Sequence, residues 1–202
     1  MINYQIVKEI EGWCSHEKMN KMVSLILATK PEHIVEIGVF YGKSLICQAL
    51  ALKKNKIGKI HGIDPWDATY STQYLTNHID IDWWNTINYN NVYDTFCNNI
   101  KEADVEYFVD IIKNNSVNSV NHINFEIDIL HIDGNHEEES SCKDVELYLP
   151  KIKQRGFLWF NDANWGQCKK AIELIENEYQ LELIDKVVSD DPNNFCNLYI
   201  KV

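Results

Sequence analysis

The chain has 202 residues, of which 45% are hydrophobic and 24% charged, so it is long enough for one domain with a sizeable core. Its formal net charge is −11 and Arg155 is its only arginine, so neither nucleic acid nor an anionic membrane is expected as its main partner. It has no apolar run of the roughly 18 residues that a membrane span needs, no recognisable signal peptide at Met1 and no CxxC pair among six scattered cysteines, which favours the cytoplasm.

Helical and strand-like patterns alternate along the chain. Apolar residues recur at helical spacing in the stretches 2–10, 16–29, 43–54, 137–149 and 166–179. Strand-like runs fall at 33–38, 59–64, 105–113, 127–133, 157–162, 181–186 and 196–202. This alternation predicts a Rossmann-like, doubly wound α/β fold whose mostly parallel seven-stranded sheet has helices on both faces. The short segment 189–194 suits a hairpin and predicts one antiparallel strand.

We expect an N-terminal helical segment over 1–30 and one domain over 31–202, with an insertion at 65–100. The insertion is rich in Trp, Tyr, Asn and Asp. It is either a solvated connection with a helix in its second half or a lid or partner-contact region, because loops at the C-terminal ends of strands build sites in such sheets. Its tryptophans, Trp66, Trp83 and Trp84, could equally extend the core.

The stretch VEIGVFYGKS, residues 35–44, ends like a nucleotide-binding P-loop but lacks its spacing. The motif needs a glycine where this chain has Ile37, and the Glu36 carboxylate would repel a polyphosphate. A strand, a glycine turn and a helix instead suit the first loop of a doubly wound sheet, with the helix N-terminus aimed at a ligand. A dinucleotide site would need G-x-G-x-x-G, whereas only bulky residues stand between Gly38 and Gly42.

Acidic or amide side chains stand at the ends of four predicted strands, namely Glu36, Asp64, Asp133 and the pair Asn161-Asp162. The C-terminal ends of parallel strands converge on one edge, where ligands bind. Acids gathered there would repel each other in an empty protein. They therefore predict a cationic ligand, a metal ion or hydroxyl-rich groups at that edge.

Individual residues suggest roles at this edge, each with a plainer alternative. Asp64 stands where Rossmann-type folds bind ribose hydroxyls, or it is a turn residue before a proline. Asp133 and Asp162, with Asn161, make an all-oxygen set that suits Mg²⁺, or both acids cap the helices that follow. His136, at the mouth of a predicted helix, is expected to stay neutral and serve as a base or ligand, or it is a capping or surface histidine.

Four motifs follow one another in an order that points to one enzyme family. They are VEIGVFYGKS, HGIDPW, HIDGNHEEE and WFNDANWGQCKKAIE. In that order, they resemble four sequence motifs of class I S-adenosylmethionine-dependent methyltransferases: the first motif, the second motif, the I-D-G-x-H signature and the D-D-x-x-x-x-G-x-x-x-A stretch. The resemblance is to the compact group of this family that includes sugar O-methyltransferases. The resemblance runs from about residue 31 to 202. It implies methyl transfer from S-adenosylmethionine to a hydroxyl of a small molecule, such as a sugar or glycosylated metabolite.

The resemblance also implies roles for particular residues. The implied cofactor-binding residues are Glu36 near the ammonium group, the loop residues Gly38, Tyr41, Gly42 and Ser44, Asp64 at the ribose, Trp66, Asn115 and Ser116 at the adenine, and Asp133. The implied catalytic residues are Asp133, His136 and Asp162, and the metal ligands of metal-dependent members correspond to Asp133, Asn161 and Asp162. Relatives often have two acids where this chain has Asn161-Asp162, which weakens the case for Mg²⁺. Without a metal, His136 or Asp133 is the candidate base.

Two other interpretations stay open at this point. The chain is either a non-catalytic S-adenosylmethionine-binding scaffold or, less in keeping with its glycine spacing, an NAD-dependent oxidoreductase. Members of the resembled family often form homo-oligomers, so a second copy of the chain is the one macromolecular partner that the resemblance implies.

Overall fold

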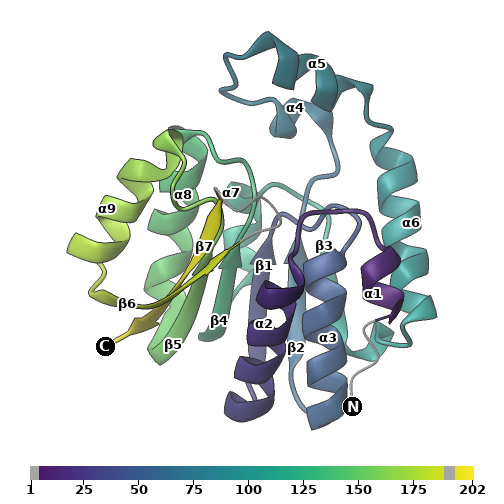
Figure 1. Ribbon diagram of the computed structural model, residues 1–202, viewed down its shortest axis with the longest axis vertical. Helices are drawn as coiled ribbons and strands as arrows, with labels where there is room; N and C mark the ends of the chain where they lie inside the picture. The colour runs from purple at the N-terminus through teal and green to yellow at the C-terminus, as the bar shows by residue number, and fades with distance from the viewer. Residues whose placement is uncertain (1–4, 189–193) are drawn as a thin grey trace.

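The computed structural model describes residues 5–188 and 194–202. Its centre is a seven-stranded sheet with the strand order β3-β2-β1-β4-β5-β7-β6, drawn in Figure 1. The strands are β1 (His33–Ile37), β2 (Lys59–Ile63), β3 (Val109–Ile112), β4 (Ile127–Ile132), β5 (Ile152–Phe160), β6 (Leu181–Val188) and β7 (Phe195–Lys201). β7 pairs antiparallel with both of its neighbours, and the other pairings are parallel. The predicted Rossmann-like, mostly parallel α/β fold with one antiparallel strand is confirmed.

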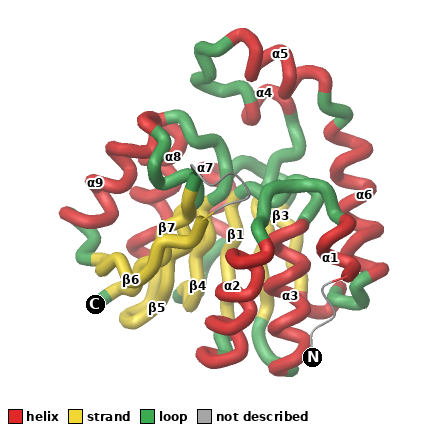
Figure 2. The backbone as a smooth tube through the Cα atoms, viewed as in Figure 1, coloured by secondary structure: helices red, strands yellow, loops and turns green. Residues whose placement is uncertain are grey.

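Two layers of helices cover the sheet, as Figure 2 shows. One face packs against α1 (Gln5–Glu9), α2 (His16–Thr29), α3 (Lys43–Asn55) and α6 (Tyr89–Glu102). The other face packs against α7 (Ser116–Ser119), α8 (Glu138–Tyr148) and α9 (Lys169–Asn177). The central strands are mostly apolar because both of their faces are covered, and every residue of β4 is buried, including the polar Asp128 and His131.

The register of the central strands brings their C-terminal ends level. Ile37 is paired with Ile63 on one side and with Ile132 on the other, and Ile132 is paired with Phe160. The hydrogen-bond ladder continues one step further, because Asp133 N donates to the carbonyl oxygen of Ile37 at 2.8 Å. The residues that follow these strands are therefore neighbours at one edge of the sheet.

Element boundaries differ from the sequence prediction where local turns intervene. The third strand begins at Val109 instead of 105, because Glu106–Phe108 form a 3₁₀ turn. The predicted helix at 166–179 is a 3₁₀ turn, Gly166–Cys168, followed by α9. Two other 3₁₀ turns are Val120–His122 and Leu149–Lys151. Residues 189–193 of the predicted hairpin turn, and the first residues of the helix predicted at 2–10, lie outside the described residues.

The insertion forms three helices: α4 (Ala68–Ser71), α5 (His78–Thr86) and α6. The helix predicted in its second half is therefore confirmed as α6. In Figure 1, α4 and α5 stand beyond the C-terminal edge of the central strands, while α6 returns beside α3. Among the helices of residues 5–188 and 194–202, none has the length and apolar character that crossing a membrane requires. All six cysteines lie in the described ranges, and none of them forms a disulfide.

Candidate active site

The loop after β1 depends on two glycines with left-handed backbone conformations. Gly38 has a φ of +86°, and a Cβ added there would lie 2.0 Å from the carbonyl oxygen of Asp133. Gly42 has a φ of +87°, and its Cβ would lie 2.5 Å from the ring of Phe96 in α6. Only glycine fits such positions. Gly38 thus allows the loop to pack on the end of β4, and Gly42 makes room for a side chain of the insertion.

Asp64 fastens this glycine loop to the end of β2. Its Oδ2 accepts hydrogen bonds from the backbone N–H groups of Val39 and Phe40 at 2.9 and 3.0 Å, and its Oδ1 accepts one from Trp66 N at 2.7 Å. Burial raises the pKa of Asp64, although these hydrogen bonds oppose that effect. Both oxygens are therefore in use within the chain. Ribose binding by Asp64 stays a prediction. It would require the carboxylate oxygens to accept from ribose hydroxyls in addition to these backbone N–H groups.

Glu36 lies inside the wall of the site and not on its surface. It is fully buried, its Oε1 accepts from Ser44 Oγ at 2.6 Å, and its Oε2 accepts from Gln48 Nε2 at 2.5 Å. Burial raises its pKa to about 8. Ser44, 7% exposed, points its hydroxyl at Glu36. Contact of Glu36 or Ser44 with a cofactor stays a prediction, and it would need a rearrangement of these bonds.

Trp66 is a packing residue in this structure. It is 4% exposed and stacked on Phe96 at 5.3 Å between ring centroids, with Tyr93 against its edge at 4.9 Å. Its Nε1 donates to the carbonyl oxygen of Phe40. The core alternative that the sequence left open therefore describes Trp66 better than a place beside adenine. A ring covered in this way offers little surface to a ligand.

The other implied cofactor residues are also held within the chain. The Tyr41 carbonyl oxygen accepts from Asn99 Nδ2 at 3.1 Å. Asn115 caps α7 by accepting from Asn118 N at 2.8 Å, and the Ser116 carbonyl oxygen accepts from the Tyr148 hydroxyl at 2.6 Å. These residues follow the C-terminal ends of β1 and β3, and the hydrogen bonds described are all made within the chain. Their roles in cofactor binding therefore stay predictions.

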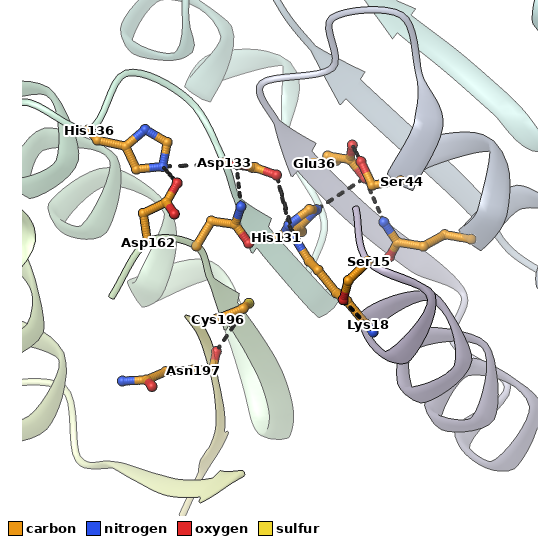
Figure 3. Close-up of polar contacts among 12 residues, drawn as sticks. Ser15, Lys18, Glu36, Ser44, His131, Asp133, His136, Asp162, Cys196 and Asn197 are labelled. Atoms are coloured by element: carbon orange, nitrogen blue, oxygen red, sulfur yellow. Dashed lines mark hydrogen bonds and ion pairs between the residues drawn. The ribbon is translucent and has the colours of Figure 1, made fainter. Parts of the chain in front are cut away.

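Three of the predicted site residues come together beyond β4 and β5, as Figure 3 shows. His136 Nε2 lies 3.0 Å from Asp162 Oδ2 and 3.9 Å from Asp133 Oδ1. Each of these residues has one possible metal-ligand atom, a carboxylate oxygen or an imidazole nitrogen, and the three atoms lie within 4.8 Å of one another. Asn161 Nδ2 donates to Asp133 Oδ1 at 2.7 Å. The structure thus unites the predicted catalytic residues Asp133, His136 and Asp162 in one partly buried cluster.

The helix N-terminus predicts a lowered pKa for His136, whereas its surroundings shift the pKa in the opposite direction. Burial would lower the pKa of His136, but the Asp162 contact and the charge of Asp133 outweigh burial and raise it. The helix N-terminus was the basis of the expectation, and the two carboxylates have the larger effect. Within the described chain, Nε2 makes no hydrogen bond of regular geometry although Asp162 is at ion-pair distance. The two carboxylates that Nε2 faces favour a proton on that nitrogen, which leaves Nδ1 as the basic nitrogen of the neutral ring.

Two residues of the site escaped the sequence analysis. Lys18, from the first turn of α2, places its Nζ 2.9 Å from His131 Nε2 and 3.4 Å from Asp133 Oδ2, and it donates to Asn161 Oδ1. His131 is fully buried within β4, and burial followed by the charge of Lys18 lowers its pKa to about 3. His131 Nδ1 in turn lies 3.2 Å from Glu36 Oε2. A continuous line of polar groups therefore joins the glycine-loop side to the β4–β5 side.

A signal for Lys18 was present in the sequence. The apolar stripe of α2 includes Met22 and Ile26, and Lys18 precedes Met22 by one helical repeat of four residues. A lysine on the buried stripe of a helix needs a partner. Its partners were not predictable, since they lie more than a hundred residues further along the chain.

The acids at this edge do repel each other, since besides burial the charge of Asp133 raises the pKa of Glu36 and the charge of Glu36 raises the pKa of Asp64, but the chain also supplies partners for them. Three backbone N–H groups satisfy Asp64. The Lys18 ammonium faces Asp133, and the His136 imidazole faces Asp162. These partners reduce the repulsion on which the prediction of a cationic ligand depends, and that ligand stays a prediction.

A magnesium site made of Asp133, Asn161 and Asp162 does not fit these contacts. Asn161 Oδ1 accepts from Lys18, and its Nδ2 points at Asp133, so the amide offers no oxygen to a metal. The acids that do gather share their cluster with an imidazole nitrogen, whereas Mg²⁺ prefers oxygen ligands. The residues present therefore disagree with the predicted metal site.

Aromatic side chains from three segments meet above the glycine loop. Trp13, which precedes α2, stacks on Phe40 at 5.5 Å and meets Trp83 of α5 edge-on at 6.0 Å. Trp84 meets both Phe40 and Trp83 edge-on. Trp13 is 61% exposed and Trp83 44% exposed. We call Trp13, Phe40, Trp83 and Trp84 the aromatic cluster.

The insertion is also bound to the turn after β4, where Asp133 and His136 lie. Asn135 Nδ2 donates to the carbonyl oxygens of Tyr70 and Gln73 at 3.2 and 2.8 Å. Asn135 directly precedes His136, so α4 is fixed against the turn that carries this histidine. With the aromatic cluster at its other end, the insertion bridges the edge of the sheet where the predicted site residues lie.

Comparison with known families assigns most of the chain to one family. A family model described as a methyltransferase domain matches residues 35–163. This range begins in β1 and includes Asp133, His136 and Asp162.

Two curated relatives are themselves described as uncharacterized proteins. One is y4gI of Sinorhizobium fredii, 26% identical over 140 residues that make up 69% of this chain and 14% of the relative. The other is R132 of Acanthamoeba polyphaga mimivirus, 29% identical over 128 residues that make up 63% of this chain and 50% of the relative. The chain thus spans half or less of the length of these relatives.

The fold is also found among solved structures. An O-methyltransferase from Bacillus cereus, in complex with SAH, superimposes with a TM-score of 0.67 over 93% of this chain and 82% of that protein. The two sequences are 15% identical. At that identity the likeness establishes a common fold.

Proposed function

Because the chain belongs to the methyltransferase domain family, we propose that it transfers a methyl group from S-adenosylmethionine to a hydroxyl of a small molecule. The observation that carries the proposal is the pairing of His136 Nε2 with Asp162 Oδ2 at 3.0 Å, at the sheet edge that the glycine loop also reaches. S-adenosylmethionine supplies an electrophilic methyl group on a positively charged sulphur. While His136 is neutral, the partly exposed carboxylate of Asp162 suits such a cation.

The proposed role of His136 is to take the proton of the acceptor hydroxyl. As the acceptor oxygen bonds to the methyl carbon, the carbon–sulphur bond breaks and its electron pair stays on sulphur. We assign the neutral imidazole a proton on Nε2, which faces the Asp162 carboxylate, so that Nδ1 takes the hydroxyl proton while Asp162 stabilises the imidazolium. General-base help of this kind contributes roughly 10²–10⁴-fold. Alignment of the reacting atoms contributes on the order of 7–11 kcal/mol at best.

Magnesium assistance, which the sequence predicts, enters no step of this mechanism. Of the predicted metal ligands, Asp133 and Asn161 contact Lys18 and each other, and Asp162 faces His136. His136 and Asp162 provide proton removal without it.

The proposed acceptor is a sugar or glycosylated metabolite, and the aromatic cluster supports this proposal. Aromatic rings present flat apolar faces that pack on the faces of sugar and phenol rings. Trp83 and Trp13 have such faces partly exposed, on the bridge between the glycine loop and the insertion. We assign the acceptor to this side of the edge.

The test is a methyl-transfer assay with S-adenosylmethionine labelled in its methyl group and a panel of sugars, glycosides and phenols. We expect labelled methyl ether from a glycoside, and calorimetry should show one donor molecule bound per chain. Absence of donor binding contradicts the proposal, and binding of NADH instead would favour an oxidoreductase. Donor binding without transfer to any acceptor would favour the non-catalytic scaffold. Cytoplasmic location and homo-oligomerisation stay predictions from the sequence.

A further inference from the structure

The proposed mechanism leaves Lys18 without a role, although it lies at the centre of the polar cluster. Lys18 is 2% exposed, and its ammonium group faces His131 Nε2, Asp133 Oδ2 and Asn161 Oδ1. An ammonium group has three N–H donors, so each donor has one acceptor. No donor is left for a substrate. Lys18 is therefore a positioning residue and not a catalytic one.

The chain holds Lys18 in place against a local cost. A positive charge in the first turn of a helix is disfavoured by the helix dipole, and α2 is a regular helix of 14 residues. Ser15 fixes the start of α2, since its Oγ accepts from Lys18 N at 3.2 Å and donates to the Val188 carbonyl oxygen of β6 at 3.0 Å. In the next turn, Lys21 Nζ lies 2.5 Å from Asp185 Oδ2. These bonds fasten the N-terminal end of α2 to the sheet and direct Lys18 into the cluster.

Asn161 suits an ammonium partner better than a metal partner. Its single carbonyl oxygen accepts from Lys18, and its amide nitrogen donates to Asp133 Oδ1 at 2.7 Å. An acid at position 161 would add a third carboxylate beside Asp133 and Asp162, which one ammonium group would not balance. The amide at 161 and the lysine at 18 thus complement each other.

We infer that the Lys18 ammonium occupies the position that a divalent metal ion would otherwise take between Asp133 and Asn161, so that a cation of the chain's own N-terminal helix orients Asp133. A metal ion bound to Asp133 would lie within a few ångströms of this fixed positive charge, since Nζ is 3.4 Å from Asp133 Oδ2. Its catalytic consequence rests on the proposed function: methyl transfer then needs no added metal.

Binding of Mn²⁺, measured by the loss of the electron paramagnetic resonance signal of the free ion, tests the inference without donor or acceptor. The proteins compared are the wild type, the double variant Lys18→Met/Asn161→Asp, and Lys21→Met as a control that removes a charge from the same helix. We expect no stoichiometric Mn²⁺ binding by the wild type or by Lys21→Met. The double variant should bind one Mn²⁺ roughly 100-fold more tightly, because the repelling charge is gone and an acid is added.

A purely structural role for Lys18 would not produce this gain of metal binding. Wild-type protein that binds one Mn²⁺ as tightly as the double variant would overturn the inference, and so would a folded double variant with no gain. Circular dichroism checks folding. If the double variant does not fold, the wild-type measurement still decides.

Removal of metal ions by a chelator tests whether methyl transfer depends on a metal. Once an acceptor is found, wild-type turnover should be unchanged by EDTA, and turnover that EDTA abolishes and Mg²⁺ or Mn²⁺ restores would overturn the inference. If no acceptor is methylated, the proposed function fails, while the Mn²⁺ measurement still tests the position of the Lys18 charge.

Discussion

The two sides of the sheet edge stabilise their acidic side chains in different ways. On the β1–β2 side, Glu36 and Asp64 accept hydrogen bonds from hydroxyl, amide and backbone N–H groups that the fold fixes in place. The one imidazole that Glu36 faces in the described chain, His131, is fully buried, and burial lowers its pKa to about 3. On the β4–β5 side, Asp133 and Asp162 face the charged or titratable groups of Lys18 and His136. Acids whose hydrogen-bond partners are fixed dipoles stabilise the structure of the loops around them. Acids paired with a titratable group keep the capacity for proton transfer.

The largest expected effect is on the β4–β5 side, from His136→Ala. Removing the proposed base should lower kcat by about 10²–10⁴-fold and leave donor affinity nearly unchanged, because the side chain acts on the acceptor hydroxyl. Steady-state kinetics and calorimetry measure the two quantities. His122→Ala, at an exposed histidine of a 3₁₀ turn, is the matched control and should behave like wild type. An unchanged kcat in His136→Ala would remove the histidine from the mechanism.

On the β1–β2 side, Asp64→Asn should reduce stability. The amide has one acceptor oxygen in place of two, so it cannot serve the N–H groups of Val39, Phe40 and Trp66 together. The free energy of unfolding should fall by about 1–3 kcal/mol, measured by urea denaturation. Asp104→Asn, whose side chain is 86% exposed in its ion pair with Lys53, should change stability little. Equal stability of Asp64→Asn and wild type would show that the loop does not depend on this carboxylate.

A smaller effect is expected above the edge, from Trp83→Ala. Loss of one ring from the aromatic cluster should raise the acceptor KM by up to roughly tenfold without changing donor affinity. Tyr107→Ala removes an exposed ring next to the N-terminal end of β3, away from the edge, and should leave KM unchanged. An acceptor KM that is equal in Trp83→Ala and wild type would place the acceptor elsewhere.

The smallest effect at pH 6 is expected from Glu36→Gln, because the folded wild type already holds this side chain protonated. The folded pKa of about 8 exceeds the ordinary value of 4.5, so the folded state binds more protons between these values. Wild-type stability from this group therefore falls as pH rises from about 4.5 to about 8, whereas the variant lacks this dependence. Urea denaturation should show a difference below about 1 kcal/mol at pH 6 and a more stable variant at pH 9. A stability difference that is equal at both pH values would contradict the assignment.

Local patterns predicted most of the fold. β1, β2 and β4 were predictable because their sequences are mostly apolar, as expected for strands with both faces buried. α2 began and ended where predicted, with Ser15 as its cap and Lys30 in a left-handed conformation before Pro31. β3 was predicted too long, because a 3₁₀ turn and a strand share its apolar composition.

The candidate site was predictable only in part. Strand ends indicated Asp133 and Asp162, and the turn after β4 indicated His136. Lys18 was missed because its partners are distant in sequence, and the burial of Trp66 was left open because it depends on Phe96 of the insertion. Hydrogen bonds of this kind join segments whose spacing in the sequence carries no information about their distance in space.

The kcat of Asp162→Ala, at a donor concentration that calorimetry shows to be saturating, tests most directly whether the β4–β5 side carries the chemistry. Asp162 Oδ2 is 3.0 Å from the proposed base, so we expect turnover to fall on the order of 100-fold or more while the donor binds as it does to wild type. Turnover equal to wild type, or an equal loss of turnover and donor binding, would contradict the assignment of methyl transfer to this side.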